Sequence, residues 1–193
     1  ALRSSIIPEL IEHHKKDRTL RIWSSACSAG QEIYSLAMML REDFPMLHDW
    51  TLYLQATDIS ELVLEKAKSG IYSSMEAHRG LDDHFLHKYF DSIEKGAFQI
   101  KPSIRQMVNF SHHNLVGDWP FYPKFDLIML RNVLIYFKQD VKDKVLQKMH
   151  QQLNGSDSVL ILGAAESIYL NDLYKLVPLD KISFYKPNSP VKV

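Results

Sequence analysis

One stretch near the start of the chain constrains the fold more than any other, because a strand, a small-residue loop and a helix follow one another directly. The strand is predicted at Thr19–Ser24, the residues up to Gly30 are mostly Ser and Ala, and a helical pattern runs from Ile33 to Leu40. Small side chains allow a ligand to approach the backbone, as at the nucleotide-binding turn of Rossmann-like folds. The stretch therefore predicts an α/β fold with a ligand site beyond the end of this strand.

The first turn of the same helix carries an acid, Glu32, which restricts the ligand. Its carboxylate would repel a pyrophosphate at this helix start and attract a cation. S-adenosyl-L-methionine carries both an ammonium and a sulfonium group, so it fits this charge. The loop has a single glycine, Gly30, in place of the repeated glycines of the dinucleotide fingerprint, and on spacing alone an ordinary strand-to-helix turn fits equally well.

The rest of the chain alternates between strand-like and helix-like patterns, which predicts a mostly parallel sheet covered by helices on both faces. Strands are expected at 52–56, 99–101, 107–111, 125–130, 159–162 and 182–185, and helices at 6–11, 33–40, 61–69, 81–90 and 140–153. The segment Ser73–Lys101 is longer than a crossover requires, so a small insertion is expected there. We expect the 193 residues to form a single domain, with a small subdomain within 73–112.

Charge and composition argue against several classes of protein. Lys and Arg together number 23, as do Asp and Glu, and this zero net charge argues against a domain that binds nucleic acid. The single cysteine, Cys27, excludes an internal disulfide and a cysteine-rich zinc site, and the pair His112-His113 has no partners at metal-site spacing. The sequence shows neither an apolar run of membrane-spanning length nor a signal peptide, so a cytoplasmic protein is expected.

Polar residues follow further predicted strands, at the edge where ligands bind in open α/β sheets. Asp58 ends the second strand and can accept both hydroxyls of a ribose, although an Asp at a helix start also serves as a cap, in competition with Ser60. Asn114 can read an adenine edge while aromatic residues shield the ring. The histidines at 112 and 113 fit a solvated strand end.

A fourth polar segment follows the strand predicted at 125–130. Arg131 and Asn132 come directly after this buried strand, where polar loop residues commonly serve a ligand. Tyr136 can point into the same cleft, whereas Phe137 fits core packing better. Glu166 ends the strand at 159–162 and is a weaker candidate for the cleft. Cys27 has no His or Asp near it in sequence, which favours a small loop residue over a nucleophile.

These segments together resemble the CheR family, the S-adenosylmethionine-dependent methyltransferases of bacterial chemotaxis receptors. The matching segments, in chain order, are Ile22–Ala37, Ala56–Ile59, Arg79–Leu81, His113–Leu115, Phe125–Phe137 and Leu162–Glu166. Their order and spacing cover almost the whole chain, and the run Arg131–Phe137 is highly specific. The resemblance implies a Rossmann-like class I methyltransferase fold with S-adenosyl-L-methionine as cofactor. It implies methyl transfer to receptor glutamates, giving glutamyl methyl esters and S-adenosyl-L-homocysteine.

The resemblance also implies roles for individual residues. Tyr136 matches a tyrosine beside the methyl-transfer centre, and Arg131 is the second candidate for a catalytic role. The candidate cofactor-binding residues are Glu32, Asp58, Asn114, Leu115, Asn132 and Val133, with Ala26 and Gly30 from the small-residue loop. No residue is expected to bind a metal. The expected partner is the cytoplasmic helical region of methyl-accepting chemotaxis receptors, and a monomer is favoured.

The sequence departs from the family pattern at Ala29, where Thr is common, and at Ile33, where Pro is common. Family members usually also carry a helical N-terminal domain and an Asn-x-Thr-x-Phe-Phe-Arg-like segment, to which nothing in Ala1–Leu20 corresponds. We therefore expect a catalytic domain without the N-terminal part of its parent. Two alternatives stay open: a non-catalytic module that binds the cofactor or docks on a partner, and an NAD-type oxidoreductase, against which Gly30 and Glu32 argue.

Overall fold

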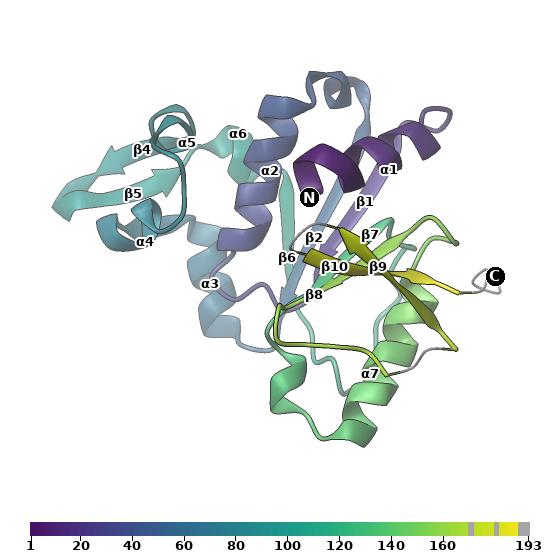
Figure 1. The fold of residues 1–193 in the computed structure, drawn as a ribbon. Coiled ribbons are helices and arrows are strands. Elements are labelled where there is room, and N and C mark those ends of the chain that lie inside the picture. The colour runs from purple at the N-terminus through teal and green to yellow at the C-terminus, as the bar shows by residue number, and fades with distance from the viewer. Residues whose placement is uncertain (170–171, 180–181, 189–193) are drawn as a thin grey trace.

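A seven-stranded sheet runs through the molecule in the order β6-β2-β1-β7-β8-β10-β9 (Figure 1). The computed structural model describes residues 1–169, 172–179 and 182–188. The strands are β1 (Thr19–Ser24), β2 (Thr51–Asp58), β6 (Val108–His112), β7 (Leu127–Leu130), β8 (Val159–Leu162), β9 (Tyr174–Leu179) and β10 (Ile182–Pro187). The first five of these pair in parallel, and β10 is antiparallel to both β8 and β9. The expected mostly parallel, Rossmann-like sheet is confirmed.

Side chains of the central strands point alternately into two hydrophobic cores, one on each face of the sheet. Leu127 and Met129 of β7 lie in the first core, and Ile128 and Leu130 lie in the second. The residues of β8 divide in the same way. A strand buried on both faces needs an apolar residue at every position, which explains the unbroken apolar runs in the sequence.

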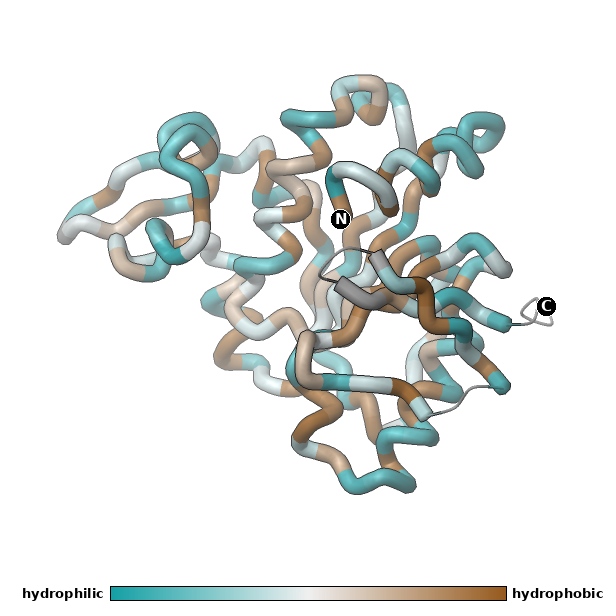
Figure 2. The backbone as a smooth tube through the Cα atoms, viewed as in Figure 1, coloured by the Kyte–Doolittle hydropathy of each residue, from teal (hydrophilic) through white to brown (hydrophobic). Residues whose placement is uncertain are grey.

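The helices divide between the two faces. Side chains of α1 (Ile7–His13), α2 (Gln31–Asp43), α3 (Glu61–Ser69) and α6 (Pro102–Arg105) enter the first core, whereas α7 (Gln139–Gln152) covers the second. In Figure 1, α7 lies across the sheet from α1 and α2. The outward-facing turns of α1 and α7 are hydrophilic in Figure 2. Each helix therefore buries an apolar stripe and leaves a polar face in solvent.

A second, smaller sheet stands to one side of the first (Figure 1). Its strands β3 (Ile71–Ser73), β5 (Ala97–Ile100) and β4 (Phe90–Ile93) pair antiparallel in the order β3-β5-β4, with α4 (Ser74–His78) and α5 (Asp83–Tyr89) between β3 and β4. It lies where the sequence predicts an insertion. Because 108–112 forms β6 of the main sheet, the small sheet ends at Ile100 and not at residue 112.

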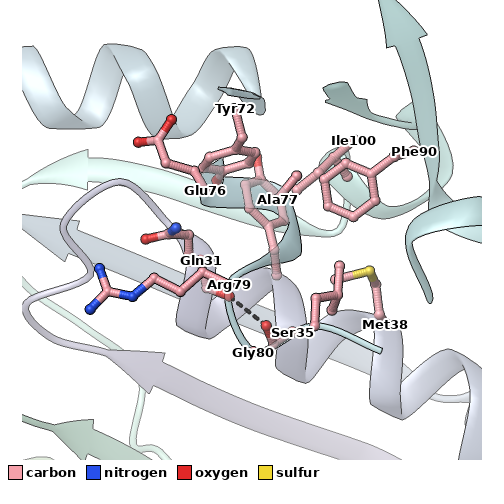
Figure 3. A pocket seen from close by; sticks show the side chains of 12 residues that line it. Gln31, Ser35, Met38, Tyr72, Glu76, Ala77, Arg79, Gly80, Phe90 and Ile100 are labelled. Carbon is pink, nitrogen blue, oxygen red and sulfur yellow. Dashed lines mark hydrogen bonds between the residues drawn. The ribbon is translucent and has the colours of Figure 1, made fainter. Parts of the chain in front are cut away.

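The small sheet contacts α2 and the loop before it. A cavity of about 50 Å³ lies at this junction, lined by Tyr72, Phe90 and Ile100 from the small sheet and by Met38 from α2 (Figure 3). The buried Tyr72 hydroxyl donates a hydrogen bond to the carbonyl of Ala29 (2.7 Å), in the small-residue loop after β1. The insertion thus supports the loop that the sequence analysis assigns to a ligand.

One buried carboxylate joins several elements at the amino-terminal edge of the main sheet. Asp126, just before β7, is 1% exposed. It accepts hydrogen bonds from the Arg21 backbone N–H (2.8 Å) and from the Asn154 side-chain amide (2.6 Å). His14 Nε2, after α1, lies 3.0 Å from the same carboxylate. This contact set ties α1, β1 and β7 together at the edge opposite the strand ends where a ligand is expected.

β9 is not among the strands expected from the sequence patterns, and it contains Pro178. Proline lacks an N–H group and normally argues against a strand. β9 is the outermost strand of the sheet, however, and proline is tolerated at such a position. β9 and β10 form an antiparallel pair from Tyr174 to Pro187 at the end of an otherwise parallel sheet.

Candidate active site at the strand ends

The carboxyl ends of β1 and β7 flank the point where the strand order of the sheet reverses. From β1 the chain proceeds to β2 and β6 on one side, and β7 and β8 lie on the other. Ligands in open α/β sheets bind at such a switch point. A cavity of about 670 Å³ lies there, a size typical of small-molecule sites. Its lining includes Ala26, Glu32, Asp58, Asn114, Leu115, Arg131, Asn132, Val133 and Tyr136.

The loop between β1 and α2 is fixed to both neighbouring strands. Ser25 donates to the Met129 carbonyl of β7 through its backbone N–H (2.9 Å) and its hydroxyl (3.1 Å). On the other side, the Cys27 N–H donates to the Thr57 carbonyl of β2 (2.9 Å). Ser28 has a φ of 49°, in the left-handed region. The loop that borders the cavity is therefore held in one conformation before any ligand arrives.

Glu32 reaches the cavity from the first turn of α2. Its Oε1 accepts a hydrogen bond from the Ser24 hydroxyl (3.1 Å), and its Oε2 accepts one from Arg131 Nη1 (2.5 Å). The Arg131 and Glu32 side chains are 45% and 26% exposed, so water screens part of their attraction. The amino terminus of the helix also stabilises a negative charge here. A ligand ammonium group can therefore bind this carboxylate in competition with Arg131.

The Asp58 carboxylate holds backbone on both sides of the cavity. Its Oδ2 accepts from the Ser28 N–H (2.8 Å) and its Oδ1 from the Ser60 N–H (3.0 Å). Ser60 precedes α3 without a side-chain capping bond, and the bond from the Ser60 N–H to Asp58 lies before the first turn of that helix. Each carboxylate oxygen can accept a further hydrogen bond. Glu32 and Asp58 therefore face one shared cavity, as a cationic, ribose-containing ligand requires.

Asn114 and Leu115 follow β6 and line the cavity from a third side. The Asn114 Oδ1 accepts a hydrogen bond from the Val116 N–H (3.0 Å), which leaves the side-chain NH₂ to donate to a ligand. Leu115 is buried, and its carbonyl accepts from Trp119 Nε1 (3.0 Å). An amide donor beside an apolar side chain suits the edge and face of an aromatic base.

His113 differs from the solvated strand end that the sequence suggests. The residue is 4% exposed, and its ring contacts Trp23 and Trp119 at centroid distances of 5.7 and 5.1 Å. Burial lowers the pKa of His113 to about 4, with smaller contributions from the charges of Lys148 and His112. His113 is therefore uncharged at neutral pH and contributes an aromatic wall beside Asn114. His112 is exposed, as predicted.

The chain turns sharply after β7. Asn132 adopts a φ of 58°, and a 3₁₀ turn at Leu134–Tyr136 follows shortly after it. Tyr136 lies on the cavity rim and is 78% exposed. Phe137 packs against the second core, as predicted. Asn is among the few residues that tolerate the left-handed conformation, so the turn depends on the residue at this position.

Gly30 does not line the cavity, in contrast to the other predicted site residues. It precedes α2 with a φ of 84°. A Cβ atom at this position would lie 3.0 Å from Ala67 Cβ and 3.2 and 3.3 Å from the rings of Tyr34 and Phe110. The structure therefore explains this glycine by the close packing of α2 against α3 and β6.

Cys27 lies in the loop with its side chain buried. Burial, with smaller contributions from the negative charges of Asp58 and Glu32, raises the pKa of its thiol to about 12. A thiol that stays protonated at neutral pH is a poor nucleophile. The interpretation of Cys27 as a small loop residue agrees with this environment.

Three further residues contribute to the site without being singled out by the sequence patterns: Ser24, Gln31 and Ile59. Ser24 orients Glu32 through its hydroxyl, and Gln31 and Ile59 line the cavity next to Glu32 and Asp58. Their positions directly beside predicted residues were the available signal.

A second cavity of about 660 Å³ also borders Glu32 and Arg131 and includes apolar side chains such as Met39 and Ile161. The Glu32–Arg131 ion pair therefore borders both cavities.

A family model described as "CheR methyltransferase, SAM binding domain" matches residues 1–182. The chain belongs to the CheR family. Among its relatives, chemotaxis protein methyltransferase Cher2 of Pseudomonas putida is 39% identical over 180 residues, covering 91% of this chain and 65% of its own length. Chemotaxis protein methyltransferase 1 of Pseudomonas aeruginosa is 40% identical over 181 residues, with the same two coverages.

The CheR chain thus spans about 65% of the length of these two relatives. A solved TehB-like SAM-dependent methyltransferase from Corynebacterium glutamicum superposes with a TM-score of 0.49 at 14% identity, over 86% of this chain and 78% of that one. None of the helices in the described part of the chain is long and apolar enough to cross a membrane.

The residues of this CheR domain fit S-adenosyl-L-methionine, the cofactor of the matching domain model. Two carboxylates, Glu32 and Asp58, face one cavity of small-molecule size, and an amide donor and an apolar side chain line the same cavity. The carboxylates complement an ammonium and a sulfonium, and would oppose a phosphate. This charge pattern agrees with the preference for S-adenosyl-L-methionine over NAD inferred from Glu32.

Proposed function

We propose that this chain is the catalytic domain of a protein-glutamate methyltransferase that modifies chemotaxis receptors. Residues 1–193 act as one methyltransferase domain, and the products are glutamyl methyl esters and S-adenosyl-L-homocysteine. The observation that carries the proposal is the shared cavity of Glu32 and Asp58 at the switch point of a CheR cofactor-binding domain. The names of the Pseudomonas relatives support chemotaxis receptors as the substrate class.

Each wall of the cavity has a role in holding the cofactor. Glu32 binds the ammonium group, and Asp58 accepts hydrogen bonds from the ribose hydroxyls. Asn114 and Leu115 receive the adenine, and Asn132 and Val133 complete the pocket beside Ala26. When bound, the cofactor supplies a methyl group on a positively charged sulfur. The loops fixed by Ser25, Ser28 and Ser60 hold these groups in place before the cofactor enters.

The acceptor is a carboxylate that is already ionised at neutral pH, so the chain needs no general base. Its residues contribute by alignment, because holding two reactants in line replaces a costly encounter. The positive charge of the donor and the negative charge of the acceptor both decrease during the transfer, so a partly dry cleft favours the reaction. Tyr136, on the cavity rim, hydrogen-bonds to the reacting groups or excludes water from them.

Arg131 is the cationic group best placed to attract the acceptor carboxylate. Its guanidinium contacts Glu32 and borders both cavities. An ammonium group on Glu32 satisfies that carboxylate, which leaves Arg131 able to pair with an incoming glutamate. The acceptor lies on the cytoplasmic helical region of a receptor, and we place the enzyme in the cytoplasm as a monomer.

The decisive experiment combines binding and turnover. Isothermal titration of this chain with S-adenosyl-L-homocysteine should give a measurable heat, and Asp58→Ala should weaken binding by about 1–3 kcal/mol, roughly 5- to 150-fold. Asp49→Ala, at an exposed position away from the cavity, is the matched control and should bind like wild type. Equal affinities for wild type and Asp58→Ala would refute the ribose assignment.

Turnover is measured with radiolabelled S-adenosyl-L-methionine and receptor-containing membranes. Both this chain and its full-length parent are assayed, and alkali should release the label from a glutamyl ester as methanol. Transfer by the parent supports the enzyme function, and comparison with this chain shows what the remaining sequence contributes. Binding without transfer by either protein would favour the non-catalytic module instead.

A further inference from the structure

Glu166 has the densest set of hydrogen bonds around the site, yet it does not line the cofactor cavity. Its Oε1 accepts from the backbone N–H groups of Val133 (2.9 Å) and Leu134 (2.7 Å). Its Oε2 accepts from the N–H groups of Asn132 (2.8 Å) and Gly163 (2.7 Å). One carboxylate therefore binds four backbone donors from the two loops that follow β7 and β8.

Three of these donors are consecutive in sequence, at 132–134. Successive N–H groups that converge in this way form a concave anion-binding nest. The left-handed φ of Asn132 (58°) is what turns the three groups toward one point. In this protein a side chain of the chain itself fills the nest, so the nest is not available to a carboxylate or phosphate of a ligand.

The loop after β8 is shaped to deliver this carboxylate. The Glu166 N–H donates to the Gly163 carbonyl (2.9 Å), which closes a tight turn. A Cβ atom on Gly163 would lie 2.4 Å from Asn132 Oδ1, 2.7 Å from Glu166 Oε2 and 2.9 Å from the Asn132 nitrogen. Distances this short leave no room for a side chain. Gly163 is therefore required for the two loops to approach each other.

The segment held by Glu166 is the one that carries site residues. Asn132, Val133 and Tyr136 line the cofactor cavity, whereas Glu166 borders the neighbouring cavity. We propose that Glu166 is a positioning residue whose carboxylate fixes the 132–136 turn in the conformation that presents these groups to the cofactor and acceptor. The expected effect on cofactor binding rests on the proposed function, whereas the effect on the conformation of the 132–136 turn can be tested without any cofactor.

The chemistry of the four donors makes the test sharp. In Glu166→Gln one oxygen becomes an NH₂ group, which faces two backbone N–H groups as donor against donor. Glu166→Asp keeps the charge but shortens the side chain, so it cannot reach both loops. We expect both variants to weaken S-adenosyl-L-homocysteine binding by about tenfold or more in isothermal titration. Glu65→Gln, at an exposed position on α3, removes the same charge and should bind like wild type.

A second readout is amide hydrogen exchange of residues 132–134 in the cofactor-free protein. Wild type should protect these amides, and Glu166→Gln and Gly163→Ala should expose them while the central strands stay protected. Unchanged exchange and unchanged affinity in Glu166→Gln would overturn the inference. If wild type itself does not bind S-adenosyl-L-homocysteine, the proposed function fails, and the exchange data alone decide the role of Glu166.

Chemical rescue separates positioning from general damage to the fold. Glu166→Ala leaves the nest open, and added sodium formate can supply a small carboxylate to it. We expect formate, compared with equal sodium chloride, to restore part of the affinity for S-adenosyl-L-homocysteine and part of the amide protection. A loss that formate leaves unchanged would show that the carboxylate is not the group that holds the turn.

Discussion

At the scale of single residues, the two acids of the cavity are held by different kinds of partner. Glu32 is bound by side chains, from Ser24 and Arg131, whereas Asp58 is bound by the backbone of Ser28 and Ser60. Side-chain partners can move away when a ligand arrives, but backbone partners stay. Glu32 is thus the adjustable acid of the pair, and Asp58 is the fixed one.

Tyr136→Phe removes one hydroxyl from the cavity rim. Because Tyr136 is 78% exposed and packs little, the variant should keep the stability of wild type. We expect methyl transfer to slow by about 5- to 10-fold, the value of one neutral hydrogen bond, with S-adenosyl-L-homocysteine affinity nearly unchanged. The assay is single-turnover methylation of receptor membranes by the full-length parent protein, with Tyr169→Phe (76% exposed) as control. Equal rates in wild type and Tyr136→Phe would remove the hydroxyl from the mechanism.

His113 makes the stability of the domain depend on pH. Burial lowers the pKa of His113 from 6.5 to about 4, so between these values the unfolded chain binds a proton that the folded chain does not. The free energy of unfolding that depends on His113 is therefore highest above pH 6.5, and it decreases as the pH falls toward 4. In His113→Phe, which keeps an aromatic ring, this component should disappear, amounting to about 1–2 kcal/mol between pH 7 and pH 5.

The measurement is the free energy of unfolding in urea at several pH values. Other groups titrate in the same range, so the quantity that matters is the difference in slope between wild type and His113→Phe. Asn109→Ala, at an exposed position on the same strand, should keep the slope of wild type. Parallel slopes for wild type and His113→Phe would contradict the lowered pKa.

At the scale of elements, the small sheet stabilises the loop after β1. Tyr72→Phe removes the hydrogen bond from β3 to the Ala29 carbonyl, and Tyr72 is 2% exposed. We expect the variant to lose about 1 kcal/mol of unfolding free energy, because a partly buried carbonyl is left without its donor. Amide exchange at residues 26–30 should increase. Tyr169→Phe is again the control, and no change in either quantity would show that the contact contributes nothing.

The elements also show what the sequence could and could not predict. Unbroken apolar runs identify β7 and β8, because both of their faces are buried. Residues that follow strand ends, such as Asp58 and Asn132, were predicted because strand ends of a parallel sheet meet at one edge. The four bonds of Glu166 were not predicted, because they depend on how the loops after β7 and β8 approach each other. Pro178 is compatible with a strand at the outer position of β9, and the sheet order that gives β9 this position does not follow from the sequence pattern.

At the scale of the whole molecule, the two cores share the same strands. Leu20 of β1 lies in the first core and Leu160 of β8 in the second, and both are fully buried. Leu160→Ala should cost about 2–5 kcal/mol of unfolding free energy, whereas Leu62→Ala should cost less than about 0.5 kcal/mol because Leu62 is 82% exposed.

Because neither core can lose its strands alone, tryptophan fluorescence and far-UV circular dichroism should report one common midpoint in urea. Separate midpoints would show that the faces unfold independently.

The carboxylate of Asp126 joins several elements of the domain at one edge of the main sheet. It fastens β1, β7 and the end of α1 at the margin away from the cavity, through contacts with Arg21, Asn154 and His14. Strands bound at one margin cannot slide past each other, so any opening must take place at the opposite margin, among the loops. Cofactor and product can therefore enter and leave through movement of these loops, while the register of the strands stays the same.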